Sequence, residues 1–263
     1  MRGPACTATV RDATLRWVDR WVIGWSLCPF ARAPRRKPSA LALHVSTATT
    51  RTALLGEVGT ALRALESGPA ETALLALAPP VDPASELAIA HTDCALSARA
   101  HPRARQRAPH GAALTVHVGA RAAVAAFLSL GWAVEAEVDE VAPPDTVQIA
   151  LFHPGAKRSI YDASEQARPR GPGPCVVGAR APPSQPRPSE RLPPQADPAD
   201  YVQRAPFPTI HLLRTADVRA VADGSAAAIA AGLPARNAQR MSEHGVSVLE
   251  TEFARLRSGD EQL

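Results

Sequence analysis

The sequence is poor in aromatic residues and in cysteine, and it contains no long apolar run. No stretch approaches the roughly 18 to 20 apolar residues of a membrane-spanning helix, so we expect no membrane association. The four cysteines show no C-x-x-C spacing and no pattern of the secreted, disulfide-rich kind. Aromatic residues make up 4% of the chain, and no basic stripe is interleaved with them, so we expect no nucleic-acid partner.

The charge is nearly balanced, and the composition indicates a folded protein. There are 29 basic and 25 acidic residues, and the net charge of +4 is weak evidence for binding nucleic acid. Basic clusters at residues 32–37 and 99–107 are interpreted as solvated loops. The hydrophobic fraction of 46% excludes wholesale disorder. Asp12 and a tryptophan-bearing segment precede any apolar core of a secretory signal, which favours a cytoplasmic protein, with an organelle as the alternative.

The hydrophobic periodicity predicts alternating helices and strands. Apolar positions recur at helical spacing from residue 10 onward, and this amphipathic helix should end near Leu27 because Cys28 precedes Pro29. We expect one sheet whose strands include residues 41–45, 72–78, 146–152 and 208–214, and helices at residues 51–66, 121–141, 216–231 and 234–257, with a break near Gly245. The predicted fold class is α/β: a small two- or three-layer sheet with flanking helices, built from β-α-β units, in a single domain spanning residues 8–257.

Two segments do not read as core. Residues 82–118 are predicted to be a partly disordered insertion that ends in a possible strand at 113–118. Residues 156–197 are Pro-rich and of low complexity, and we predict a disordered insertion because proline cannot donate backbone hydrogen bonds.

Five residues could carry chemistry. His153 follows the apolar run VQIALF, at the carboxyl end of what should be a central strand, where open α/β sheets bind ligands. His211 lies inside the strand PTIHLLR, and either histidine could instead be structural. Arg204 and Arg214 could clamp a carboxylate or phosphate, or pair with nearby aspartates. Cys28 leaves a helix carboxyl end, where the helix dipole raises the pKa of a thiol, which favours a buried structural thiol unless a cation lies close.

Several strings together resemble one family. They are WVIGWSLCPFA at 21–31, QIALFHP at 148–154, DPADYVQRAPFPTIHLLR at 197–214 and LPARNAQRMSEHG at 233–245. These resemble the DUF1415 family, uncharacterised proteins with a conserved L-C-P-F-A opening, an F-H-P strand end and a block ending in H-L-L-R. The resemblance covers residues 10–80, 121–155 and 198–257. It implies an α/β fold without an established activity.

The family pattern marks ten positions of this chain: Cys28, Pro29, Phe30, His153, Pro154, Arg204, Pro206, Pro208, His211 and Arg214. The sequence departs from the pattern at Gln203, where the family usually has Asn. It departs again at residues 155–160, where an aromatic-bearing segment usually follows. Both departures lie beside the expected site.

Three hypotheses for the function follow. In the first, an enzyme uses Cys28, His153 and His211 in one cleft, with Arg204 or Arg214 holding a small anionic substrate. The three could bind a divalent metal such as zinc with an open position, or Cys28 and a histidine could form a nucleophile and base. In the second, a non-catalytic module binds an anionic metabolite. In the third, the Pro-rich stretch PPSQPRP serves as an interaction motif. The sequence gives neither the reaction nor the oligomeric state.

Overall fold

Four strands form one mixed sheet at the centre of the computed structural model, which describes residues 7–37, 39–79, 85–91, 110–143, 145–167, 197–222 and 226–258. The strand order is β1-β2-β4-β3, for β1 (Leu41–Ser46), β2 (Thr72–Leu77), β3 (Val147–Phe152) and β4 (Thr209–Arg214). Strands β1 and β2 are parallel, and β4 is antiparallel to both of its neighbours, β2 and β3. The predicted α/β fold is confirmed.

The expected central position of residues 146–152 is wrong. These residues form β3 at the edge of the sheet, whereas β2 and β4 occupy the centre. Every residue of β2 is buried, while Gln148 of β3 is exposed to solvent. The β-α-β unit was expected to repeat, with residues 146–152 as its next strand. Strand β3 does run in the same direction as β2, but β4 lies between them, so β2 and β3 do not pair.

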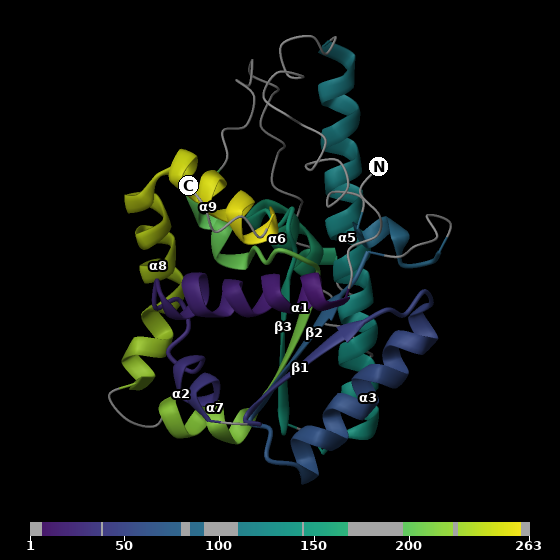
Figure 1. Cartoon of the computed structure of the whole chain (residues 1–263), viewed down its shortest axis with the longest axis vertical. Coiled ribbons are helices and arrows are strands. Elements are labelled where there is room, and N and C mark those ends of the chain that lie inside the picture. Colours follow the sequence, from purple (N-terminus) through teal and green to yellow (C-terminus); the bar gives the residue numbers. More distant parts are fainter. Residues whose placement is uncertain are drawn as a thin grey trace, which may run out of the picture.

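Helices cover both faces of the sheet, which gives three layers (Figure 1). One face packs against α3 (Arg51–Ser67) and α5 (His110–Val141). The other packs against α1 (Thr7–Arg16), the π-helix η1 (Trp17–Ile23), α8 (Ala226–His244) and α9 (Val246–Ser258). Because side chains alternate along a strand, Ile210 and Leu212 join the α3/α5 core, and His211 between them faces the η1 side.

Local signals explain the helix limits that the sequence predicted. The Thr50 hydroxyl accepts a hydrogen bond from the Ala53 backbone N–H at 3.2 Å and caps the start of α3. The break expected near Gly245 is confirmed, since this residue has φ +74° between α8 and α9. Helix α7 (Thr215–Ala222) precedes α8, and residues 223–225 between them lie outside the described residues.

Three segments that were expected to be strand, disordered or loop are helical in the structure. Residues 113–118 are part of α5 and not a strand, because they continue, on its N-terminal side, the helix that includes the alanine-rich residues 120–126. Residues 158–167, at the start of the expected disordered insertion, form α6 (Arg158–Ala167), and η3 (Pro198–Gln203) follows it. The basic residues near position 35 form the short helix α2 (Arg32–Arg36) and not a loop.

The remaining parts of both insertions lie outside the described residues. These are residues 82–84, residues 92–109, which follow the short helix η2 (Ala88–His91), and residues 168–196. Within the described part of the chain, none of the helices has the length and apolar character needed to cross a membrane.

Candidate functional site

The segment that follows the first helix places Cys28 beside the sheet. After α1 the chain widens into the π-helix η1, with i→i−5 hydrogen bonds from Gly24 to Asp19 (3.0 Å) and from Leu27 to Val22 (2.8 Å). A Cβ atom at Gly24 would collide with the backbone of the preceding turn, so glycine fits this end of the helix. The expected helix end near Leu27 is confirmed. The π geometry was not predicted, and such segments occur frequently at functional sites.

Helix α8 holds the loop that follows η1. The side chains of Arg236 and Asn237 donate hydrogen bonds to the carbonyl oxygens of Ser26 (2.9 Å) and Leu27 (2.7 Å). Arg240 donates to the carbonyl oxygen of Trp25. These three residues belong to the string LPARNAQRMSEHG, and they fix the backbone immediately before Cys28.

A cavity of about 450 Å³ lies between η1, α2, α7 and the sheet. Most of its wall is apolar and includes Trp17, Val22, Leu74, Phe152 and Leu213. A smaller set of polar or ionisable side chains also lines it: Cys28, Lys37, Glu71, Thr72, His211, Arg214, Asp217 and Asn237. The structure therefore brings together Cys28, His211 and Arg214 of the five predicted site residues.

Cys28 is a half-buried thiol in this cavity. Burial raises its pKa above the ordinary value of a thiol, although the backbone N–H groups of Phe30 and Ala31 and the charge of Arg236 act in the opposite direction. The sequence predicted a raised pKa from the helix dipole, whereas the main cause is loss of hydration. Cys28 is therefore a protonated thiol at neutral pH.

His211 is a neutral imidazole in the wall of the same cavity. Its Nε2 atom lies 2.5 Å from the Thr72 hydroxyl, which is also 3.1 Å from the carbonyl oxygen of Leu212. Burial lowers the pKa of His211 to about 4. The imidazole is thus uncharged at neutral pH and hydrogen-bonds to the neighbouring strand.

His153 does not reach this cavity, so the expected cleft of Cys28, His153 and His211 is wrong. Phe152 faces the cavity, and the next residue of an extended chain points to the opposite side. There His153 is fully buried, with its ring centre 5.4 Å from that of Phe127. Its Nδ1 atom accepts from the Gly155 backbone N–H (3.0 Å), so Nε2 carries the proton and donates to the Ala90 carbonyl oxygen (2.8 Å).

These contacts make His153 a structural residue. Burial lowers its pKa to about 4, and the charges of Arg257 and Arg204 act in the same direction. The neutral ring joins the turn after β3 to η2.

The described residues do not assemble the expected metal site. Within those ranges no three or more His, Cys, Asp or Glu side chains are grouped so that they could hold a metal ion. Cys28 and His211 line one cavity, while His153 lies on the other side of the sheet, so the trio suggested for zinc is not formed.

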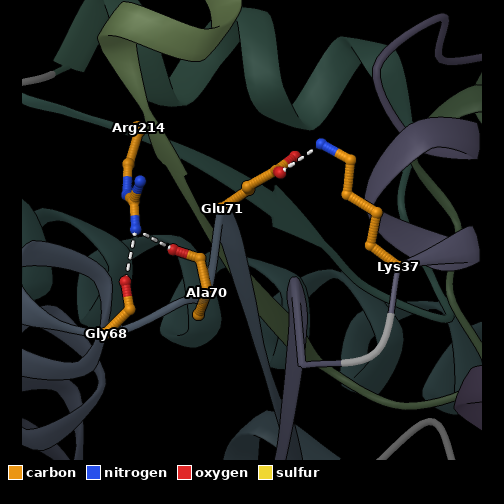
Figure 2. A network of polar contacts seen from close by, with 5 residues as sticks. All are labelled: Lys37, Gly68, Ala70, Glu71 and Arg214. Atoms are coloured by element: carbon orange, nitrogen blue, oxygen red, sulfur yellow. Dashed lines mark hydrogen bonds and ion pairs between the residues drawn. The ribbon is translucent and has the colours of Figure 1, made fainter.

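The expected clamp of two arginines is also absent. The Arg204 guanidinium lies 3.9 Å from the centre of the Tyr201 ring and donates to the Ala156 carbonyl oxygen at 3.3 Å, away from the cavity. Arg214 lines the cavity, but it points Nε at the carbonyl oxygen of Leu65 (2.7 Å) and Nη2 at those of Gly68 and Ala70 (Figure 2). Arg214 therefore secures the carboxyl end of α3 and the segment that enters β2.

Replacing Arg214 with leucine is expected to lower the free energy of unfolding by about 2–4 kcal/mol, because three carbonyl oxygens lose a charged donor. Lysine should recover less than half of the loss, since one ammonium cannot reproduce a planar fork of donors. Urea denaturation measures both effects. The control is Arg219→Leu, at a side chain that is 62% exposed, which should change stability by less than about 0.5 kcal/mol. Equal effects of Arg214→Leu and Arg219→Leu would contradict the anchoring role.

Sequence reasoning missed Lys37, Glu71 and Asp217, which also line the cavity. Lys37 Nζ and Glu71 Oε1 form an ion pair at 2.6 Å (Figure 2). Charged residues are common on every protein surface, so the residue types of these three did not mark them as site residues. Glu71 could have been found by its place directly before the buried strand β2.

The fold and the cavity together define an α/β protein with a candidate small-molecule site. The chain belongs to the family described as a protein of unknown function (DUF1415), whose model matches residues 9–86 and 191–251. The match includes the segments of Cys28, His211 and Arg214, whereas His153 lies outside it. Comparisons with curated proteins and with solved structures gave no match.

Proposed function

We propose that the protein binds a small organic molecule with a large apolar part in the cavity beside η1. The observation that carries this proposal is the cavity itself. Its volume of about 450 Å³ lies within the usual range of ligand sites, roughly 300–1,000 Å³. Apolar and aromatic walls with a few polar groups are the ordinary composition of such sites.

The protonation states favour binding over covalent catalysis. A nucleophilic cysteine is activated by a lowered thiol pKa, or by a neighbouring histidine that is basic enough to take up the thiol proton. In this cavity the shifts run the other way, because burial raises the pKa of Cys28 and lowers that of His211 to about 4. Both groups are neutral at pH 7, and they can offer hydrogen bonds to a ligand without charge.

The test is the binding of N-phenyl-1-naphthylamine, a neutral apolar dye that fluoresces in apolar pockets. We expect the full chain to bind it, and Ala33→Phe to weaken the binding about tenfold. Ala33 is an exposed residue of α2 that lines the cavity, so the added ring would fill space that the dye needs. The measurement is a fluorescence titration at constant protein concentration.

The matched control is Ala64→Phe, at an exposed alanine of α3, a helix that packs on the opposite face of the sheet. It adds the same ring to a helix surface and should leave dye binding unchanged. No binding by the unaltered chain, or equal weakening by both substitutions, would overturn the proposed function.

A further inference from the structure

Charged side chains of both signs gather where one end of the sheet meets the cavity. Glu71 directly precedes β2, and Arg214 ends β4, which is antiparallel to β2, so both lie at the same end. Lys37 comes from the segment before β1, and Asp217 from the first turn of α7. Figure 2 shows Glu71 between Arg214 and Lys37. All four residues line the cavity, so its polar end carries two positive and two negative charges.

Two of these charged groups keep unused hydrogen-bonding capacity. The Oδ2 atom of Asp217 is buried and has no hydrogen-bond partner within the described ranges. Arg214 uses Nε and Nη2 on carbonyl oxygens, and its Nη1 makes no hydrogen bond to any residue that the structure describes. Lys37 and Glu71 neutralise each other. A buried carboxylate oxygen without a donor is costly, so a rotation of the Asp217 side chain that brings this oxygen to a donor on the ligand adds binding energy.

These groups discriminate between ligand classes. A purely anionic head group would gain from Arg214 and Lys37 but would be repelled by Asp217 and Glu71. A purely cationic head group would be attracted by Asp217 and Glu71 but repelled by Arg214 and Lys37. An uncharged ligand would leave the Asp217 oxygen buried and unpaired.

We infer that the cavity takes a zwitterionic molecule, with an ammonium and a carboxylate close together on one end of an apolar or aromatic body. An amino acid with a large apolar side chain has this chemistry. Its ammonium pairs with Asp217, its carboxylate with Arg214, and its side chain lies against the apolar wall that includes Trp17 and Phe152. The inference rests on the proposed function and adds the chemical class of the ligand.

Three compounds that share an indole body test this inference on the full chain: tryptophan, indole-3-propionate and tryptamine. The first carries both charges, the second only the carboxylate and the third only the ammonium. We expect calorimetry to show that tryptophan binds about tenfold tighter than either of the others, because each charged hydrogen bond adds affinity. Equal or tighter binding of a singly charged compound would overturn the inference.

The role of Asp217 is tested with Asp217→Asn, which keeps the shape of the side chain and removes its charge. The variant should lose the preference for tryptophan over indole-3-propionate. Asp139→Asn, at an exposed position on α5, is the matched control and should keep this preference. Retention of the full preference in Asp217→Asn would overturn the assigned role.

The two proposals fail in different ways. If the neutral dye binds in the cavity and none of the indole compounds does, the zwitterion inference is wrong and the proposed function stands. If neither the dye nor any indole compound binds, both are wrong.

Discussion

Lowering the pH from 7 to 4 is expected to reduce the free energy of unfolding by about 3 kcal/mol for each of two histidines, the fully buried His153 and the partly buried His211. In both, burial lowers the folded-state pKa from 6.5 to about 4. As the pH falls below 6.5, the unfolded chain takes up a proton at each site and the folded chain does not. The stability contributed by the neutral rings is thus complete above pH 6.5 and is lost progressively down to about pH 4.

Urea denaturation at a series of pH values measures this loss. His153→Gln and His211→Gln should each remove about one half of it, even if they are less stable at pH 7. The matched control is His44→Gln, at an exposed imidazole that pairs with Glu57, and it should leave the loss nearly unchanged. Asp200, whose pKa is raised by burial, acts in the opposite direction because the folded chain binds its proton more readily. A stability that stays constant between pH 7 and pH 4.5 would contradict neutral burial of the histidines.

The sequence carries enough local information to predict most of the helices and strands. Apolar residues at helical spacing and short apolar runs depend only on neighbouring positions, so α3, β2 and β4 were found close to their observed limits. The position of a strand in the sheet depends instead on its partners. Strand β4 inserts between β2 and β3 although it is the last strand along the chain, and no local pattern records this pairing.

The candidate site was only partly predictable for a similar reason. Cys28 and His211 share a cavity because η1 packs on the face of the sheet to which His211 points. His153 lies outside the cavity because the preceding residue, Phe152, points into it. Side chains alternate along a strand, so His153 points to the opposite face of the sheet. A sequence shows this alternation but does not show which face of the sheet a given helix covers.

Replacing Trp21 with alanine is expected to lower the free energy of unfolding by about 3–5 kcal/mol, the usual cost of removing a large buried aromatic side chain. Trp21 is 2% exposed and lies at the centre of the core between η1 and the C-terminal helices. Its ring centre is 4.1 Å from that of Trp25, 5.9 Å from that of Phe253 and 6.3 Å from that of Tyr201. Thermal unfolding followed by circular dichroism should show a decrease in Tm of about 10 °C.

The matched control is Trp25→Ala, at the neighbouring tryptophan, which is partly exposed and stacks on His244 with 4.5 Å between ring centres. It removes the same side chain from a more solvent-exposed position, so it should lower the free energy of unfolding by less than half as much as Trp21→Ala. Trp21 does not line the cavity, but it lies in η1, which supplies Trp17 and Val22 to the cavity wall. The Trp21→Ala variant should therefore also bind the neutral dye more weakly at temperatures where it is still folded. Equal losses of stability in the two variants would show that the core does not centre on Trp21.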